Sequence, residues 1–248
     1  MRTLLVTSQI TYVPRNYQAL FEGVLKSASS HIAGLVVLEN LSWRLSKDIL
    51  GLKLMGCSEI SRHLFKNVME ARKRERERLF ESKGLPVIRT QTMNSPEIIE
   101  YVKSKRIDLI VNARTRCIYK KPILEAPRLG CINIHHGLLP EYRGTLCDLY
   151  ALFEGRPAGF TIHQMNEKID AGKILKRIEV SGHGEKDFAA YLEKASLIEG
   201  QVLGELLNDI AAQDSLPAGI ENRSEKSVYT RNPNRKQIAK MKEEGLVL

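Results

Sequence analysis

The stretch that decides the fold is residues 133–172, which read NIHHGLLPEYRGTLCDLYALFEGRPAGFTIHQMNEKIDAG. Asn133 and His135 lie two residues apart at the end of a predicted strand, so their side chains emerge on the same face of a sheet. A carboxamide and a protonated imidazole both donate hydrogen bonds, which suits an oxygen that gains negative charge during acyl transfer. Asp170 follows in a loop that contains glycine, where its carboxylate would keep the His135 imidazole charged or relay a proton through water. These residue types indicate a site that stabilises an oxyanion.

The chain before this stretch alternates between apolar strands and helices. The strands are predicted at residues 3–8, 32–38, 85–90, 107–112 and 131–134. Several of their apolar runs are continuous, as in parallel sheets covered on both faces by helices. The pattern predicts an α/β fold with a Rossmann-like, doubly wound and mostly parallel sheet. Ligands bind beyond the carboxyl ends of the strands in such sheets, which is where the fifth strand places Asn133 and His135.

The chain after residue 145 is predicted to contain two more strands, and after residue 180 it is mostly helix with a tail. The predicted elements are a helix at 146–153, strands at 160–165 and 173–180 that form a hairpin-like extension, a long helix at 185–211 and a short helix at 237–244. We therefore divide the chain into two parts. Residues 1–182 form the catalytic domain, and residues 183–248 form a helical C-terminal extension that packs on this domain or trails from it.

Composition places the chain among globular proteins. It has 248 residues, of which 43% are hydrophobic and 27% are charged, enough for one large α/β domain with or without a small appendage. No apolar run approaches the roughly 18 residues of a membrane span, and the run at residues 4–6 is too short for a signal peptide. The four cysteines lack CxxC and metal-ligand spacing, so we expect them to be reduced and mostly buried. A soluble cytoplasmic protein is the expectation.

The net charge of +9 favours anionic partners, including nucleotides, phosphorylated substrates, RNA and acidic lipid, without choosing among them. The mixed-charge segment 70–78 is interpreted either as a solvated helix face with i,i+4 pairs or as a basic surface for RNA. The link after the first strand has neither GxGxxG nor a P-loop motif, which argues against the usual phosphate cradle. Arg15 in that link is either a surface residue or an anion-binding residue at a helix N-terminus.

Four short motifs of the central stretch resemble the signature of one enzyme family. They are Asn133-Ile134-His135, Leu138-Leu139-Pro140, Tyr142-Arg143-Gly144 and Asp170-Ala171-Gly172. In this arrangement the chain resembles the formyltransferases that use 10-formyltetrahydrofolate. That family includes methionyl-tRNA formyltransferase, glycinamide ribonucleotide transformylase, formyltetrahydrofolate deformylase and the sugar-nucleotide N-formyltransferases. The resemblance covers residues 107–180, and the run at 122–135 is similar to the methionyl-tRNA branch.

The resemblance implies Asn133, His135 and Asp170 as catalytic residues, with an amine attacking the formyl carbon of 10-formyltetrahydrofolate. It also implies a folate pocket on two segments. The residues assigned to this pocket are Arg116, Cys117, Ile118 and Tyr119 after the fourth strand and Asn166, Glu167, Lys168 and Ile169 in the later loop. The implied acceptor is a primary amine on an anionic molecule, either tRNA or a phosphorylated or nucleotide-linked amine. No metal is implied.

Three features depart from the family pattern. Gly137 stands where the family has serine before Leu-Leu-Pro. Arg114 and Arg116 make the rim of the predicted pocket more basic, which suits the anionic glutamate tail of folate. The glycine-rich phosphate loop of the glycinamide ribonucleotide branch is absent, which argues against that acceptor. The length also leads us to expect no separate C-terminal barrel of the kind found in full-length methionyl-tRNA enzymes.

A methionyl-tRNA formyltransferase-like activity is the leading interpretation. The alternatives are a sugar-nucleotide N-formyltransferase, a formyltetrahydrofolate hydrolase and a non-catalytic folate-binding protein. The sequence determines neither the acceptor nor the oligomeric state. Outside the motifs, we expect His136 and His163 to be structural or surface residues, and Asp148 to face either the site or solvent.

Overall fold

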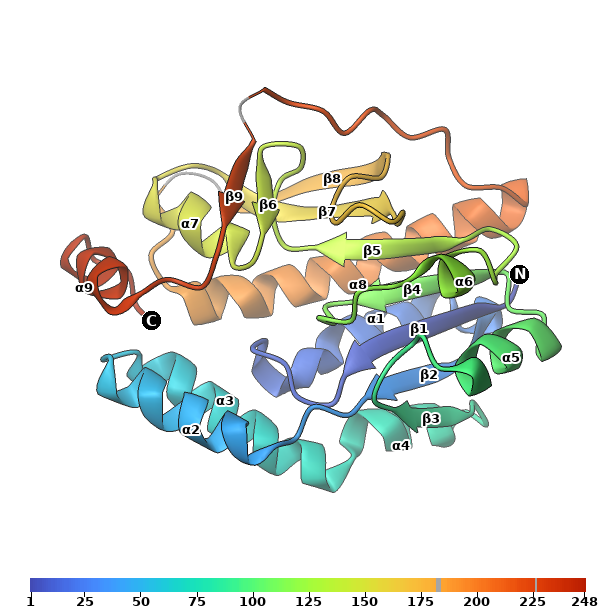
Figure 1. The fold of residues 1–248 in the computed structure, drawn as a ribbon, viewed down its shortest axis with the longest axis horizontal. Helices are drawn as coiled ribbons and strands as arrows, with labels where there is room; N and C mark the ends of the chain where they lie inside the picture. The colour runs from blue at the N-terminus through green and yellow to red at the C-terminus, as the bar shows by residue number, and fades with distance from the viewer. Residues whose placement is uncertain (182–183, 226) are drawn as a thin grey trace.

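A seven-stranded sheet forms the centre of the computed structural model, which describes residues 1–181, 184–225 and 227–248 (Figure 1). The strand order is β3-β2-β1-β4-β5-β7-β8. The strands are β1 (Thr3–Ser8), β2 (Ile32–Leu38), β3 (Val87–Thr90), β4 (Leu109–Ala113), β5 (Cys131–His135), β7 (Ala158–Gln164) and β8 (Ile174–Ser181). β1 to β5 pair in parallel, whereas β7 pairs antiparallel with both β5 and β8. The mostly parallel sheet and its hairpin extension are confirmed.

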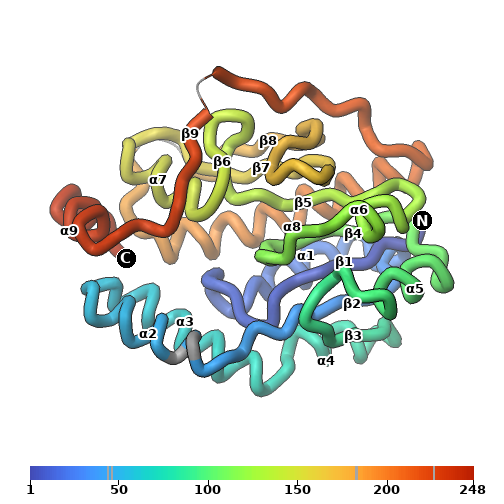
Figure 2. Tube along the Cα trace, in the orientation of Figure 1, coloured from blue at the N-terminus to red at the C-terminus, as the bar shows by residue number. Residues whose placement is uncertain are grey.

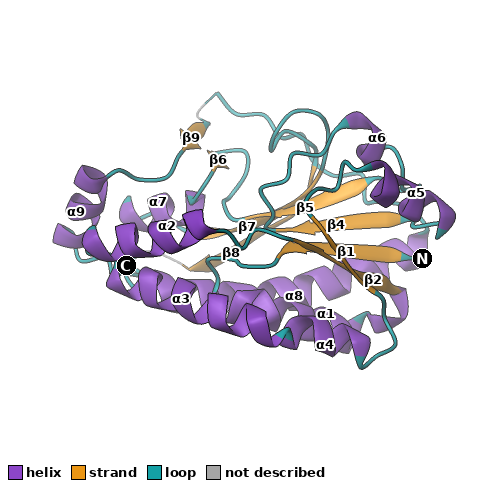
Figure 3. Ribbon diagram, turned by 60° about the horizontal axis from the view of Figure 1, so that its bottom comes forward, coloured by secondary structure: helices purple, strands orange, loops and turns teal. Residues whose placement is uncertain are grey.

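Helices cover both faces of this sheet. In Figure 3, α1, α3, α4 and α8 lie beneath the sheet, and α5 and α6 lie above it. The helices are η1 (Pro14–Tyr17), α1 (Gln18–Ser27), η2 (Ser29–His31), α2 (Trp43–Leu54), α3 (Ser58–Lys73), α4 (Glu75–Glu81), α5 (Pro96–Ser104), α6 (Lys121–Leu124), α7 (Cys147–Phe153), α8 (Phe188–Gln213) and α9 (Arg235–Glu243). Continuous apolar strands with helices on both sides are the doubly wound arrangement that the sequence predicts.

Alternation along β5 sends its side chains to two different cores. Ile132 and Ile134 are buried in the larger core, which includes residues of α1 and α8. Cys131 is buried in the smaller core, which includes residues of α5 and α6. Asn133 and His135 share the face of Cys131, because successive side chains of a strand point to opposite faces. The two polar residues therefore emerge on the face of the sheet opposite α8.

The segment after α8 returns to the central part of the chain, and Figure 2 shows it in orange and red as it crosses to β9. Ile220 forms an isolated bridge with Ile174, and β9 (Val228–Thr230) pairs in parallel with β6 (Tyr142–Gly144) as a separate two-stranded sheet. α8 and α9 both contribute to the larger core. The predicted boundary between residues 182 and 183 falls outside the described residues, and the parts on either side of it pack together.

Two further expectations bear on the chain as a whole. The four cysteines are free, and Cys57, Cys131 and Cys147 are buried, as expected. Although α8 spans 26 residues, no helix among the described residues combines the length and apolar character needed to cross a bilayer.

Candidate active site

Asn133 is held by hydrogen bonds at both ends of its carboxamide. Asn112 of β4 donates through Nδ2 to Asn133 Oδ1 at 2.8 Å, and Asn133 Nδ2 lies 3.1 Å from His163 Nε2. Thr115 Oγ1 donates to Asn112 Oδ1 at 2.7 Å, which orients the first of these two amides. A carboxamide has two N–H donors. The second N–H of Asn133 can therefore donate to a bound oxygen.

His163 of β7 is the partner that orients Asn133, since the two residues face each other in the β5–β7 pairing. Its Nδ1 donates to the carbonyl of Gln164 at 2.7 Å, which leaves Nε2 as an acceptor. Burial lowers the pKa of His163 to about 4, and the neighbouring His135 adds to the shift while Asp170 opposes it. The neutral imidazole is thus the form that accepts the Asn133 hydrogen bond at neutral pH.

His135 is also buried, with 6% of its surface exposed. Its Nε2 donates to the carbonyl of Tyr142 at 2.9 Å, and its Nδ1 lies 3.6 Å from Asp170 Oδ1. The second distance is longer than a direct hydrogen bond. When His135 is protonated, its Nδ1–H therefore points toward a carboxylate without being fully engaged by it, and it can reach a reacting oxygen.

Asp170 lies in the loop between β7 and β8, with a left-handed φ of 50°. Its Oδ1 is 3.6 Å from His135 Nδ1 and 3.7 Å from His163 Nε2. Its Oδ2 accepts a hydrogen bond from the backbone N–H of Gly144 at 3.3 Å. The side chain is 11% exposed, so the carboxylate reaches the protein surface while the imidazoles lie below it.

The fold brings Asn133, His135 and Asp170 to one place, although the aspartate comes from a loop far along the chain. Sequence reasoning missed the contribution of His163, which is buried against this group and does not lie at the surface. This burial could have been predicted in part, because His163 and Thr161 lie two residues apart in the predicted hairpin and therefore point to the same face. Its register opposite Asn133 is a property of the folded sheet.

A second polar group lies on the other side of β5. His136 Nδ1 is 2.9 Å from Asp148 Oδ2, and its Nε2 contacts Glu199 of α8, which also accepts from the Tyr17 hydroxyl. Asp148 is fully buried, so the solvent-facing interpretation is wrong. Burial lowers the pKa of His136 to about 4, and Arg114 adds to this shift while Asp148 opposes it. Burial also holds the pKa of Glu199 well above its usual range.

Arg114 belongs to this second group and not to the predicted pocket rim. It has a left-handed φ of 58°, and its guanidinium lies 5.7 Å from the ring centroid of Tyr17. Its Nη1 is buried and has no hydrogen-bond partner within the part of the chain that the structure describes. Burial lowers the Arg114 pKa, while the carboxylate of Asp148 opposes that shift. Of the two arginines expected to make the rim of the predicted pocket basic, Arg116 is thus the one that can contribute.

The first segment assigned to the folate pocket has two exposed members. Arg116 is exposed, with its guanidinium 5.7 Å from the ring centroid of Tyr12, and Ile118 is 63% exposed. Cys117 is half-buried. Tyr119 is buried in the smaller core, so its backbone can contribute to a ligand site but its side chain serves packing.

The second segment lies directly before Asp170, and all four of its assigned residues are exposed. Asn166 Oδ1 accepts from the backbone N–H of Lys168 at 2.9 Å, which forms the turn. Glu167 is a charged neighbour in that turn, and Ile169 is 64% exposed. An isoleucine exposed in each segment offers apolar surface of the kind that suits a flat heterocycle such as a pterin.

Gly137 leaves no room for the serine found at this position in the family. A Cβ atom at Gly137 would lie 2.6 Å from the Cβ of Cys147 and 2.8 Å from His135 Nε2. Burial raises the pKa of the Cys147 thiol to about 12, so that group packs as a neutral side chain. The departure from the family pattern is therefore coupled to the position of His135.

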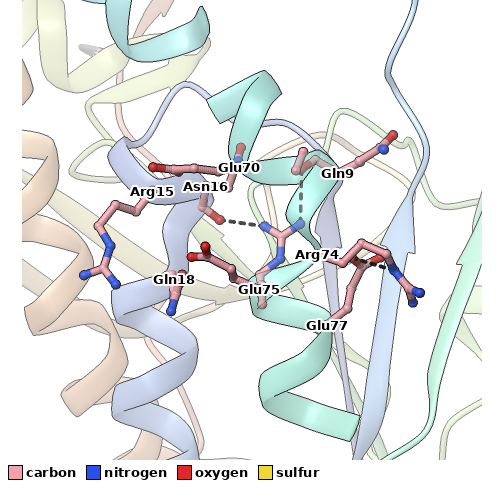
Figure 4. Close-up of a pocket in the computed structure, with 10 residues that line it drawn as sticks. Gln9, Arg15, Asn16, Gln18, Glu70, Arg74, Glu75 and Glu77 are labelled. Atoms are coloured by element: carbon pink, nitrogen blue, oxygen red, sulfur yellow. Dashed lines mark hydrogen bonds and ion pairs between the residues drawn. The ribbon is translucent and has the colours of Figure 1, made fainter. Parts of the chain in front are cut away.

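The loop after β1 borders a small hollow against the α3–α4 turn, where Figure 4 shows Asn16 facing the helices that carry Glu70 and Glu75. Arg76 closes its inner end, donating to the carbonyls of Asn16 at 2.6 Å and Ser8 at 2.9 Å. Burial lowers the Arg76 pKa to about 10. Because a protein cation already binds these carbonyls, the loop presents acceptors and not the N–H donors of a phosphate cradle.

The segment 70–78 also proves to be more structural than either interpretation assumed. Arg76 and Glu77 are buried. Arg74 lies 3.2 Å from Glu77 and 3.0 Å from Glu81. Arg15 lies 3.7 Å from Glu22, as expected of a surface residue. Part of the basic run therefore stabilises the α3–α4 region instead of facing a partner.

Comparison with known proteins shows that the chain is similar to one protein family. Residues 55–206 match the family described as Formyl transferase. A methionyl-tRNA formyltransferase of Geobacillus sp. (strain WCH70) is 36% identical over 158 residues, which are 63% of this chain and 49% of that protein. The chain thus spans about half the length of the curated relatives it matches.

Solved structures share the fold at low sequence identity. A sugar N-formyltransferase from Shewanella sp. FDAARGOS_354 has a TM-score of 0.58 and 20% identity, covering 97% of this chain and 86% of that one. The formyltransferase PseJ from Anoxybacillus kamchatkensis has a TM-score of 0.53 and 16% identity, covering 100% of this chain and 94% of its own. PseJ was solved in complex with UDP-4,6-dideoxy-4-formamido-L-AltNAc and tetrahydrofolate.

Proposed function

This chain belongs to the formyl transferase family, and from that premise we propose that it transfers the formyl group of 10-formyltetrahydrofolate to a primary amine. The observation that carries the proposal is the meeting of Asn133, His135 and Asp170, with Asp170 Oδ1 3.6 Å from His135 Nδ1. A carboxamide donor, an imidazolium donor and a carboxylate are the groups that acyl transfer to an incoming amine requires.

In the proposed reaction the amine nitrogen attacks the formyl carbon, and the carbonyl electrons move to its oxygen. The free N–H of Asn133 and the Nδ1–H of His135 donate to this oxyanion. The carboxylate of Asp170 faces His135 Nδ1 and takes the proton of the attacking amine through water. The bond from the formyl carbon to N10 then breaks, N10 receives the proton, and the products are a formamide and tetrahydrofolate.

The donor is assigned to the two segments beside the catalytic residues. Exposed Ile118 and Ile169 would contact the pterin, and the exposed guanidinium of Arg116 would attract the anionic glutamate tail. The turn at Asn166–Lys168 would close over the same ligand. The tetrahydrofolate in the PseJ complex supports a folate donor for this fold.

The acceptor is proposed to be a methionyl-tRNA-like amine in a cytoplasmic setting. The related methionyl-tRNA formyltransferase supports this choice. The net charge of +9 supports an anionic acceptor, and the exposed basic side chains near the C-terminus add to that field. The loop after β1 does not favour a small phosphorylated amine, because Arg76 already binds its carbonyl groups.

Tetrahydrofolate release from 10-formyltetrahydrofolate, followed by absorbance, tests the proposal. Methionyl-tRNA and a panel of sugar-nucleotide and small amines are supplied in turn, and the formylated product is identified by mass spectrometry. Release that depends on an amine supports the transferase. Release without any amine indicates a hydrolase, and tight folate binding without release indicates a binding protein. Formylation confined to a nucleotide sugar would contradict the choice of methionyl-tRNA.

A further inference from the structure

Three consecutive residues of β6 contact two of the three proposed catalytic residues, His135 and Asp170. The carbonyl of Tyr142 accepts from His135 Nε2 at 2.9 Å. Arg143 Nη1 donates to the carbonyl of Asp170 at 2.5 Å, and the N–H of Gly144 donates to Asp170 Oδ2 at 3.3 Å. The relative position of the imidazole and the carboxylate is therefore set through this short strand.

Asn222, from the C-terminal segment, completes the support of the Asp170 loop. Its Nδ2 donates to the carbonyls of Asp170 and Gly172, both at 2.9 Å. Its Oδ1 and its own carbonyl accept from Arg143 Nη2 at 3.0 Å and 2.8 Å. Asn222 is 5% exposed and Arg143 is 6% exposed, so these hydrogen bonds are shielded from water. One buried amide thus bridges the two carbonyls on either side of Ala171.

The pairing of β6 with β9 supports β6 from the C-terminal segment. Gly144 has a left-handed φ of 99°, and a Cβ atom there would lie 2.3 Å from the carbonyl of Thr230. Thr230 Oγ1 also donates to the carbonyl of Thr145 at 2.7 Å. Ser227 Oγ donates to the carbonyl of Pro140 at 2.8 Å. The C-terminal segment therefore packs closely against the strand that contacts both catalytic groups.

We propose that Asn222, which lies outside the central stretch, is a positioning residue for Asp170. This inference rests on the proposed formyl transfer. Asp170 needs such support because its backbone lies in the left-handed region and residues 166–169 directly before it are exposed. The Asn222 amide fixes the backbone on both sides of Ala171, so the carboxylate stays opposite His135. A displacement of about 1 Å at a reacting group can lower turnover by roughly 10²-fold.

The first test is the rate of tetrahydrofolate release by three variants. Asn222→Ala is expected to lower kcat by roughly 10- to 100-fold. Asn222→Asp keeps the oxygen that accepts from Arg143 but loses the N–H donors, so it should show a loss in the same direction. The matched control is Asn234→Ala, which removes the N-cap of α9 in the same segment and should leave kcat unchanged.

A double-variant cycle separates positioning from general destabilisation. Asp170→Asn removes the carboxylate charge while keeping a residue that tolerates positive φ. If Asn222 acts through Asp170, Asn222→Ala should change kcat by less than about 3-fold in the Asp170→Asn background, because coupled residues are not additive. Equal losses in both backgrounds would overturn the proposal, as would wild-type kcat in Asn222→Ala and Asn222→Asp.

Amide hydrogen exchange provides a readout that does not depend on activity. Exchange across residues 165–172 should rise in Asn222→Ala and stay unchanged in Asn234→Ala. Unchanged exchange in both variants would contradict the positioning role. If the wild-type protein transfers no formyl group to any amine, the proposed function fails, whereas the exchange result still decides whether Asn222 orders the Asp170 loop.

Discussion

The two sides of β5 carry two histidine–carboxylate pairs that differ in how completely their polar groups are engaged. On one side His135 Nδ1 lies 3.6 Å from Asp170, whose side chain is 11% exposed. On the other side His136 lies 2.9 Å from Asp148 and also contacts Glu199, and both carboxylates are fully buried. His136 has a carboxylate beside each ring nitrogen and no solvent, which makes it structural, whereas the incompletely paired Nδ1 of His135 near the surface is available for chemistry.

The charges of the two groups follow from the same difference. Burial lowers the pKa of His136 to about 4 and raises that of Glu199, so both groups are neutral at neutral pH. The pKa of Asp148 is lowered, because the hydrogen bond from His136 and the nearby Arg114 together outweigh its burial, so this carboxylate is the charged member of the enclosed group. The opposite side pairs a carboxylate that reaches the surface with an imidazole whose Nδ1 is only partly engaged. His135 at the end of β5 and His136 directly after it thus have separate roles, and the following predictions test this separation.

Removal of either member of the His135–Asp170 pair should have the largest effect. We expect His135→Ala or Asp170→Ala to lower turnover by roughly 10²-fold or more, because each removes an electrostatic or acid–base group. Tetrahydrofolate release at saturating donor measures the loss. The control is His31→Ala, because His31 lies at the end of η2, far from the site residues in the sequence. Near-wild-type turnover in either variant would remove that residue from the mechanism.

Removal of His136 should instead act on stability. We expect His136→Ala to lower the free energy of unfolding by about 3 kcal/mol, because it leaves the buried carboxylate of Asp148 without the hydrogen bond from His136. Urea denaturation measures this loss, and His135→Ala provides the comparison. If His136→Ala retained full stability but lost turnover as severely as His135→Ala, the distinction between the two sides would be wrong.

The free energy of unfolding should decrease as pH falls from the ordinary histidine pKa toward the native pKa values. Burial lowers the native pKa of both His136 and His163 to about 4, below the ordinary histidine value of 6.5. The unfolded chain then binds more protons, so the stability that each group contributes is present above pH 6.5 and is lost as pH falls toward 4. Denaturation of the wild type and of His163→Gln across this pH range measures the effect. The free energy of unfolding should depend less steeply on pH in the variant. Identical slopes would exclude a depressed native pKa for His163.

Restoration of the family serine should have the smallest of these effects. Gly137→Ser is expected to lower kcat by roughly 10-fold, because its Cβ would displace Cys147 or His135 and so disturb the approach to a reacting oxygen. Gly51→Ala is the matched control, since a Cβ there meets nothing within 4 Å. A Gly137→Ser enzyme as fast as the wild type would show that the His135 position does not depend on this glycine.

The general form of the fold followed from patterns that are local in the chain. Continuous apolar runs predicted the parallel strands, and the alternation of residues 160–165 predicted the hairpin that became β7 and β8. The boundaries moved by a few residues, because the ends of strands depend on pairing partners. Folding placed His163 between Asn133 and Asp170, with His163 Nε2 3.1 Å from Asn133 Nδ2 and 3.7 Å from Asp170 Oδ1.

The sequence by itself determined which residue types the site contains and the face of β5 on which Asn133 and His135 emerge, because side-chain alternation in a strand is a local property. Only the tertiary structure decided that His163 orients Asn133, that Arg114 turns toward the buried group and that Asn222 supports Asp170. These contacts join residues distant in the chain, and their partners depend on strand register, left-handed backbone positions and burial. No local pattern encodes those three quantities, since each is set by the packing of the whole chain.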